Sequence, residues 1–271
     1  MTASFARSIL PLAAAVLAWL VLLSPAQCGE LRVGGTGSAT ELLKYLARGF
    51  ASESETQIEV IPSLGSSGGI RALGDGVLDL AVSGRPLKPD EKSKGLKVGL
   101  VIRTPFVLAT SHPNPNGLTR AAVIEAFSTH TPAWGDGSPI RIILRPRSES
   151  DTALLGKLFP GLASAIEDAR KRPDVPVAAT DQDNVEMAER TPGSLVGSTL
   201  TQMRMEKSNL RTIAIDGVAP SLEAFERGDY PYGKELYFVL PSTPSPLAER
   251  FLQFLRSPEG QRLLRDAAMV Q

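Results

Sequence analysis

The sequence has a single cysteine, Cys28, and only two histidines, His112 and His130. One cysteine excludes an intramolecular disulfide, so burial of apolar side chains must hold the fold together. The same scarcity leaves no Cys/His cluster with the spacing of a metal site. We therefore expect neither a disulfide framework nor a metal in this chain.

An excess of charge of one sign is also missing. The 271 residues carry 29 basic and 29 acidic side chains, which gives a formal net charge of +0. Proteins that bind nucleic acid or anionic lipid usually carry a basic patch, so the sequence argues against both kinds of partner. The composition, 42% hydrophobic and 21% charged, is that of an ordinary globular protein.

The histidines also lack the surroundings of a common catalytic motif. Neither His112 nor His130 lies in a His-Glu-x-x-His motif or in a Gly-x-Ser-x-Gly context. Residues Gly65–Gly69 lack the lysine of a P-loop, and Gly35–Gly37 lack the third glycine of a dinucleotide fingerprint. We expect a protein that is not an enzyme, with no catalytic residue and no cofactor; a secreted hydrolase is a remote alternative.

An apolar run from Ile9 to Leu23 predicts a secretory signal peptide, cleaved after Ala26. An uncleaved membrane anchor needs roughly 20 apolar residues, which is more than this run supplies. Ser24 and Ala26 are the small residues of a cleavage site. A lipoprotein anchored at Cys28 would need a small residue where Gln27 stands. We therefore expect an exported protein.

The most informative stretch is Ser63–Arg71, which contains two serines and three glycines. It follows an alternating run, Gln57–Ile61, that predicts a strand, and it precedes the apolar spacing of a helix over residues 68–76. Such a turn directs free backbone N–H groups and the positive end of the helix dipole at one point. It predicts a pocket for a small oxyanion; the alternative is a helix cap with a flexible loop.

The pattern around this stretch predicts a βαβαβ unit over residues 31–83. Its strand ends carry small polar residues: Thr36 and Ser38, then Ser66 and Ser67, then Ser83. In an open α/β sheet, ligands bind outside the carboxyl ends of the strands. Three such loops favour a binding site more strongly than one loop does.

The second part of the chain repeats the order of strand, Ser/Thr-rich turn and helix around residues 140–158. Further strands are expected at 98–102, 106–110, 194–196, 211–215 and 235–240. Further helices are expected from Thr119 to Phe127 and at 161–171, 182–190 and 246–255, with a last helix starting after Ser257.

The order of these segments resembles that of the periplasmic phosphate-binding proteins of ABC transporters. The resemblance rests on several motifs in sequence: Gly-Ser-Ser-Gly-Gly from Gly65, Ala-Val-Ser-Gly-Arg-Pro from Ala81, Ile-Asp-Gly-Val-Ala-Pro from Ile215, Tyr-Pro-Tyr from Tyr230, and Phe-Leu-x-Phe-Leu-x-Ser-Pro-Glu-Gly-Gln from Phe251. It covers nearly the whole mature chain.

The resemblance implies an α/β fold of type II periplasmic binding proteins. Each of its two lobes is a mixed sheet flanked by helices, and the ligand binds in the cleft between them. After the signal peptide at 1–26, lobe 1 is expected to hold residues 27–105 and 236–271, and lobe 2 residues 106–235. The two segments that cross between the lobes are expected near 103–108 and 229–235.

The resemblance also implies a ligand site. The first glycine-rich loop of the family corresponds to Thr36, Gly37 and Ser38, and the second loop to Ser66, with Ser67 and Ser83 nearby. In the other lobe, Ser150 and Thr152 match a Ser-Gly-Thr turn. Arg85 either reaches the cleft or forms a salt bridge at the surface or between the lobes.

Three positions depart from the family pattern. The family arginine falls on Pro146, so Arg145 or Arg147 must supply the guanidinium, and Arg147 is preferred. The middle glycine of the Ser-Gly-Thr turn is Asp151. The family aspartate that accepts the proton of hydrogen phosphate falls on Gly84.

The loss of that aspartate leaves two interpretations of Asp151. Either Asp151 or Glu149 replaces the missing acceptor from the opposite lobe, or Asp151 only caps the helix that follows it. We expect a monomeric periplasmic solute-binding protein that captures phosphate or a related small oxyanion for an ABC-type permease. The alternative is a binding protein of the same fold with a different ligand, which serves a sensor.

Overall fold

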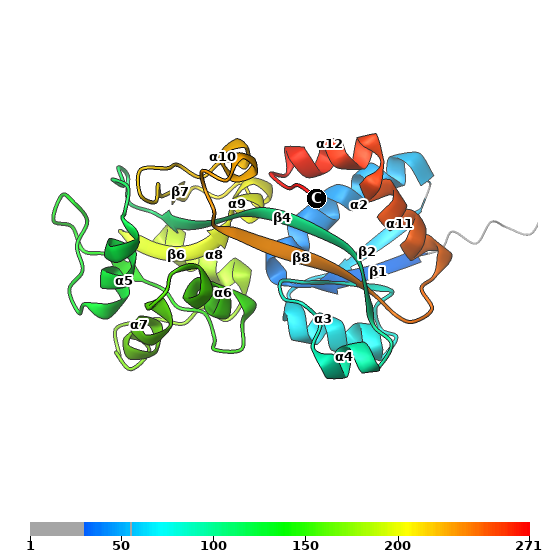
Figure 1. Cartoon of the computed structure of the whole chain (residues 1–271), viewed down its shortest axis with the longest axis horizontal. Helices are drawn as coiled ribbons and strands as arrows, with labels where there is room; N and C mark the ends of the chain where they lie inside the picture. The colour runs from blue at the N-terminus through cyan, green and yellow to red at the C-terminus, as the bar shows by residue number, and fades with distance from the viewer. Residues whose placement is uncertain (1–29, 55) are drawn as a thin grey trace, which may run out of the picture.

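The computed structural model describes residues 30–54 and 56–271. The predicted signal peptide and Cys28 lie outside the described residues. The chain forms two halves that lie side by side, with strands β4 (Lys97–Thr110) and β8 (Gly233–Leu240) crossing from one to the other (Figure 1). Among the described residues, no helix is both long and apolar enough to cross a membrane.

The first half begins with the predicted βαβαβ unit and ends with the last two helices of the chain. Its elements are β1 (Glu30–Gly35), η1 (Gly37–Ala39), α2 (Thr40–Ser54), β2 (Gln57–Ile61), α3 (Gly65–Gly74), β3 (Leu80–Ser83), α4 (Pro89–Ser93), α11 (Pro246–Arg256) and α12 (Pro258–Asp266). Strand β1 pairs in parallel with both β2 and β3, so the three strands end at the same edge of the sheet. This edge faces the second half of the molecule (Figure 1).

The second half lies between the two crossing strands in the chain. Its elements are α5 (Arg120–Ser128), β5 (Arg141–Ile142), α6 (Ser150–Leu158), α7 (Leu162–Ala169), α8 (Asp181–Arg190), β6 (Ser194–Thr199), α9 (Leu200–Met205), β7 (Arg211–Thr212) and α10 (Leu222–Arg227). The strand order β2-β1-β3-β8-β4-β6-β5 links the two halves, and β7 pairs with β4. Helix α5 begins as predicted, with Thr119 Oγ1 accepting a hydrogen bond from Ala122 N at 3.1 Å.

Strand β4 differs from its prediction, which placed two strands at 98–102 and 106–110. The structure has one continuous strand that changes partner near Pro105. Its first part pairs with β8 as far as Pro105 opposite Gly233, and its second part pairs with β6 from Phe106 onward. Pro105 has no N–H to donate, so it is tolerated where the ladder passes from one partner to the next.

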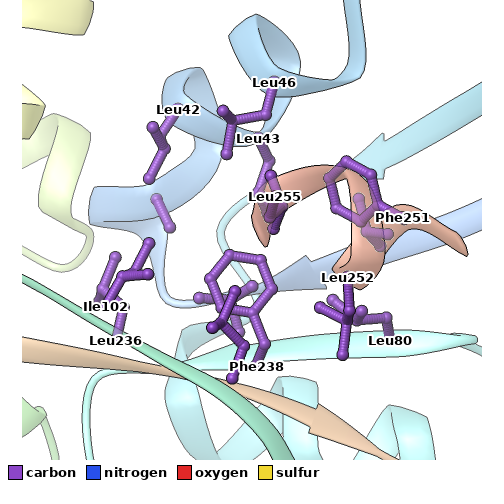
Figure 2. Close-up of a cluster of buried hydrophobic side chains, with 14 of the residues drawn as sticks. Leu42, Leu43, Leu46, Leu80, Ile102, Leu236, Phe238, Phe251, Leu252 and Leu255 are labelled. Carbon is purple, nitrogen blue, oxygen red and sulfur yellow. The ribbon is translucent and has the colours of Figure 1, made fainter. Parts of the chain in front are cut away.

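The apolar spacings seen in the sequence form a separate core in each half. In the first half, Leu42, Leu43 and Leu46 of α2 pack with Phe238 of β8 and Phe251 of α11 (Figure 2). In the second half the core includes Phe106, Phe127 and Phe159. Each core fixes the sheet edges and helix starts that face the other half.

Candidate functional site

The loop after β1 turns its donors toward the second half. Thr36, Gly37 and Ser38 are all buried. Thr36 Oγ1 lies 3.3 Å from Ser38 Oγ, and Ser38 N–H donates to Asp181 Oδ2 at 2.9 Å. Gly37 O accepts from Gln182 Nε2 at 3.0 Å. The Asp181 carboxylate therefore accepts a hydrogen bond from the Ser38 N–H, a group that the family resemblance implies would bind the ligand.

The Ser66 loop is the first turn of a helix rather than a loop before one. Helix α3 begins at Gly65, whose φ of 69° favours glycine, and not at residue 68 as predicted. Ser66 Oγ accepts from Gly84 N at 2.9 Å, and Ser67 Oγ accepts from Arg85 Nη2 at 3.0 Å. Among the described residues, no side chain caps this helix. The hydroxyls join α3 to the loop after β3.

The third strand end carries Ser83 and Arg85. Ser83 is fully buried, and its hydroxyl donates to Arg85 O at 2.7 Å. The Arg85 guanidinium pairs with Glu91 at 2.7 Å and holds the pKa of that carboxyl at about 2. Of the two roles considered for Arg85, the salt bridge is the observed one, and it forms within the first half.

The predicted turn at the start of α6 sends two of its three side chains inward. Asp151 is 5% exposed, and its Oδ1 lies 2.5 Å from Lys234 Nζ. Ser150 Oγ donates to Asp151 Oδ1 at 3.3 Å. Thr152 Oγ1 instead donates to Pro146 O at 3.0 Å and stabilises the preceding turn. Asp151 therefore faces a buried cation, which differs from the interpretation of a simple helix cap.

Lys234 is a site residue that the sequence analysis missed. It lies on crossing strand β8, is 1% exposed, and donates from Nζ to Ser38 Oγ at 3.0 Å. A signal was present, because Lys234 shares the buried face of β8 with Leu236 and Phe238 at a spacing of two residues. Fully buried lysines are rare unless they are paired, so this position indicates a built site.

Of the two candidate arginines, the structure brings Arg145 and not Arg147 to the site. Arg147 lies at the surface and pairs with Glu167 at 2.6 Å. Arg145 is 7% exposed, donates to Ala178 O at 2.6 Å, and lies 3.4 Å from Asp181. Its Nε is buried without a hydrogen-bond partner among the described residues. The preference for Arg147 is corrected because its side chain leaves the turn on the outer face.

Three carboxylates thus lie among two buried cations. Besides its contact with Asp181, Arg145 lies 3.5 Å from Glu149, while Lys234 pairs with Asp151. Burial raises the pKa of Asp181, an effect that the charge of Lys234 opposes. Burial likewise raises the pKa of Glu149, opposed by Arg145. Both shifts favour the protonated carboxyl, which reduces the negative charge of the site.

Gly84 lies close against Ser150 of the second half and Lys234 of strand β8. A Cβ atom at this position would lie 2.8 Å from Ser150 Oγ and 2.9 Å from Lys234 Cε. An aspartate at this position would therefore displace both neighbours. The structure provides a carboxylate here from the opposite half, through Asp151, rather than from the loop after β3.

Two cavities adjoin these residues. A small one of about 70 Å³ lies between Gly37, Gly65, Arg145 and Asp181. A larger one of about 440 Å³ begins at Gly84, Ser150 and Lys234 and extends outward. Across residues 30–54 and 56–271, no group of three or more His, Cys, Asp or Glu side chains is arranged to hold a metal ion.

The histidines lie apart from this cluster. His112 is buried in the second half against the Trp134 ring, at 5.2 Å between centroids, and its Nε2 lies 3.0 Å from Asp136. The site therefore combines uncharged donors from the first half with buried ion pairs from the second half and from β8. Such an arrangement suits the binding of a small anion rather than nucleophilic catalysis.

Comparison with known proteins places this geometry in context. A model of the PBP superfamily domain matches residues 23–259. The phosphate-binding protein PstS of Borreliella burgdorferi is 21% identical over 251 residues, which is 88% of each chain.

Solved structures share the fold. A putative phosphate ABC transporter substrate-binding protein from Clostridium perfringens superposes with a TM-score of 0.77 at 17% identity, over 90% of this chain and 99% of that one. The periplasmic molybdate-binding protein of Azotobacter vinelandii gives a TM-score of 0.60 at 13% identity, over 89% and 99%. The type II periplasmic binding fold expected from the sequence is confirmed.

Proposed function

The chain belongs to the PBP superfamily, and on that premise we propose that it binds phosphate or a related small oxyanion between its two halves. It delivers this ligand, as a monomer in the periplasm, to the permease of an ABC-type transporter, and it catalyses no reaction. The predicted signal peptide and the names of the relatives support this role. Those names favour transport over a sensory function.

The observation that carries the proposal is that Lys234 contacts Ser38 Oγ, while Asp181 links the Ser38 N–H to Arg145. Both cations are almost fully buried, and Ser38 and Ser66 lie in the first helical turns after strands β1 and β2. Charge-assisted hydrogen bonds to an oxyanion are short and strong, and a guanidinium and an ammonium supply them from two sides. The unpartnered Nε of Arg145 is a donor available to such a ligand.

Binding proceeds as an exchange of anions. Asp181 accepts the Ser38 N–H and neutralises Arg145, so it stands where an oxyanion would make the same contacts. A ligand that enters displaces this carboxylate and keeps the donors satisfied. The raised pKa values of Asp181 and Glu149 ease the exchange, because a protonated carboxyl repels the ligand less and donates a hydrogen bond to it.

The lobe boundaries expected from the sequence fit this mechanism. With residues 27–105 and 236–271 as one lobe and 106–235 as the other, the donors and the ion pairs lie on opposite sides of the cleft. Closure of the lobes then brings the two sets together around the ligand, and opening releases it to the permease.

Thermal unfolding of the mature chain with phosphate, arsenate, sulfate and molybdate tests the proposal. A ligand at 100 times its dissociation constant stabilises the folded state by about 2.7 kcal/mol. We expect phosphate or arsenate to raise the unfolding temperature, and the variant Arg145→Met to lose the effect. The matched control Arg147→Met should keep it. If no oxyanion shifts the transition of the unaltered chain, the proposal fails.

A further inference from the structure

The larger cavity extends beyond the space that an inorganic anion at the ion pairs would occupy. Its volume of about 440 Å³ falls within the range of about 300–1,000 Å³ found for small-molecule pockets. Gly84, Ser150 and Lys234 line it, so it shares Lys234 with the proposed anion site, whereas Arg145 lines the smaller cavity.

One wall of this cavity is apolar. Leu154 and Leu158 of α6 and Phe225 of α10 line it, and all three side chains are only partly buried. Gly233, Lys234 and Tyr237 of crossing strand β8 line the same cavity. Apolar side chains next to a charged site suit the carbon skeleton of an organic ligand, whereas hydrated inorganic phosphate gains nothing from them.

The rim of the cavity carries a surplus of positive charge. Arg103 lies over the Phe225 ring at 5.8 Å from its centroid, and Lys157 projects from α6. Neither has an acidic side chain within ion-pair distance among residues 30–54 and 56–271. Glu235, the one acid that lines the cavity, accepts a hydrogen bond from the Tyr237 hydroxyl.

We propose that the physiological ligand is a small phosphate ester whose organic part bears a carboxylate. The phosphate group binds at Lys234 beside Ser150, the carbon skeleton lies against Leu154 and Leu158, and the carboxylate faces Arg103 and Lys157. This inference rests on the proposed function, because it uses the same anion site and adds the second half of the ligand.

Titration calorimetry of the mature chain with four probes tests this inference: inorganic phosphate, phospholactate, phosphocholine and lactate. Phospholactate should bind roughly tenfold more tightly than inorganic phosphate, since it adds a charge-assisted contact and buried apolar surface. Phosphocholine bears a cation instead of a carboxylate and should show no such gain. Lactate alone should bind weakly or not at all.

Two variants locate the effect. Lys157→Ala should remove most of the advantage of phospholactate, and Ala153→Phe should fill the cavity and block phospholactate while leaving inorganic phosphate unaffected. Both positions are on the exposed part of α6, so the fold should survive the changes. Lys171→Ala, at an exposed lysine that pairs with Asp168 away from the cavity, is the matched control and should change nothing.

The outcomes separate the inference from the proposed function. Equal affinity for inorganic phosphate and phospholactate, unchanged in Ala153→Phe, would overturn the inference and leave the proposed function standing. Binding of lactate as tight as that of phospholactate would also overturn it, because the phosphate group would then be irrelevant. No binding of any phosphate compound would overturn both.

Discussion

The two halves of the molecule contribute different chemistry to the space between them. The first half offers uncharged donors, such as the Ser38 N–H and the Ser66 hydroxyl, held at the ends of parallel strands. The second half and strand β8 offer Arg145 and Lys234 together with the carboxylates that neutralise them. The first half therefore sets the geometry of the site, and the second half with β8 sets its charge. Substitutions can change the donors without changing the charged groups, and the reverse.

The largest effect is expected from removing a buried charge. Lys234→Met leaves Asp151 buried without its partner, which should lower the free energy of unfolding by about 3–5 kcal/mol in urea titrations. The double variant Lys234→Met with Asp151→Leu should recover much of this loss. Lys97→Met, an exposed lysine on the other crossing strand, is the control; a Lys234 variant as stable as this control would contradict the role of the ion pair.

The next effect concerns pH. Burial raises the pKa of Asp181, so the folded state binds its proton more tightly than the unfolded state does. The stability from this group is complete below the unfolded pKa and is lost as pH rises through the higher folded pKa. Asp181→Asn should lack this loss, so its stability relative to the unaltered chain should rise with pH between acid and neutral conditions. Parallel stability curves of the two proteins would refute this explanation.

A smaller effect is expected from removing one of the uncharged hydroxyl groups of the first half. Ser66→Ala leaves the Gly84 N–H without its acceptor and should lower stability by about 1 kcal/mol, measured by thermal unfolding. Ser67→Ala, the exposed neighbour, should have a smaller effect. Affinity for the oxyanion should fall in Ser66→Ala and not in Ser67→Ala. A loss of affinity in Ser67→Ala alone would contradict the roles given to the two serines.

The smallest effect separates the two neighbouring arginines. Arg147 lies at the surface and its pair with Glu167 is open to solvent, so Arg147→Ala should leave both the unfolding midpoint and ligand affinity unchanged. Arg145→Ala should weaken both. Equal losses in the two variants would show that the outer arginine shares in the site.

Local pattern predicts much of the first half of the molecule. The parallel strands β1, β2 and β3, the apolar face of α2 and the cap at Ser257 follow from periodicity and capping chemistry, as does the cap at Thr119 in the second half. The short helices α9 and α10 were not predicted, because six residues carry too little periodicity to stand out.

The charged half of the site was harder to predict because contacts distant in sequence create it. The Arg145 side chain is held inward by its contacts with Ala178 O and Asp181, which lie more than thirty positions away in the sequence. No local feature of the sequence distinguishes Arg145 from Arg147. Lys234 and Ser38, which form a hydrogen bond, are separated by 196 positions in the sequence. Only its alternation with buried residues on β8 could have identified it.

The pairing of Pro105 with Gly233 has a mechanical consequence. Pro105 has no N–H to bond, so this residue of β4 adds no backbone donor to the pairing, and the next hydrogen bond between the two segments runs from Phe106 N to Tyr232 O at 3.0 Å. A Cβ atom on Gly233 would lie 2.6 Å from the Phe225 ring, so that ring rests directly on the backbone of this joint. The same ring lines the larger cavity, so a molecule seated against it would contact the segment at which the proposed closure of the lobes would bend the chain.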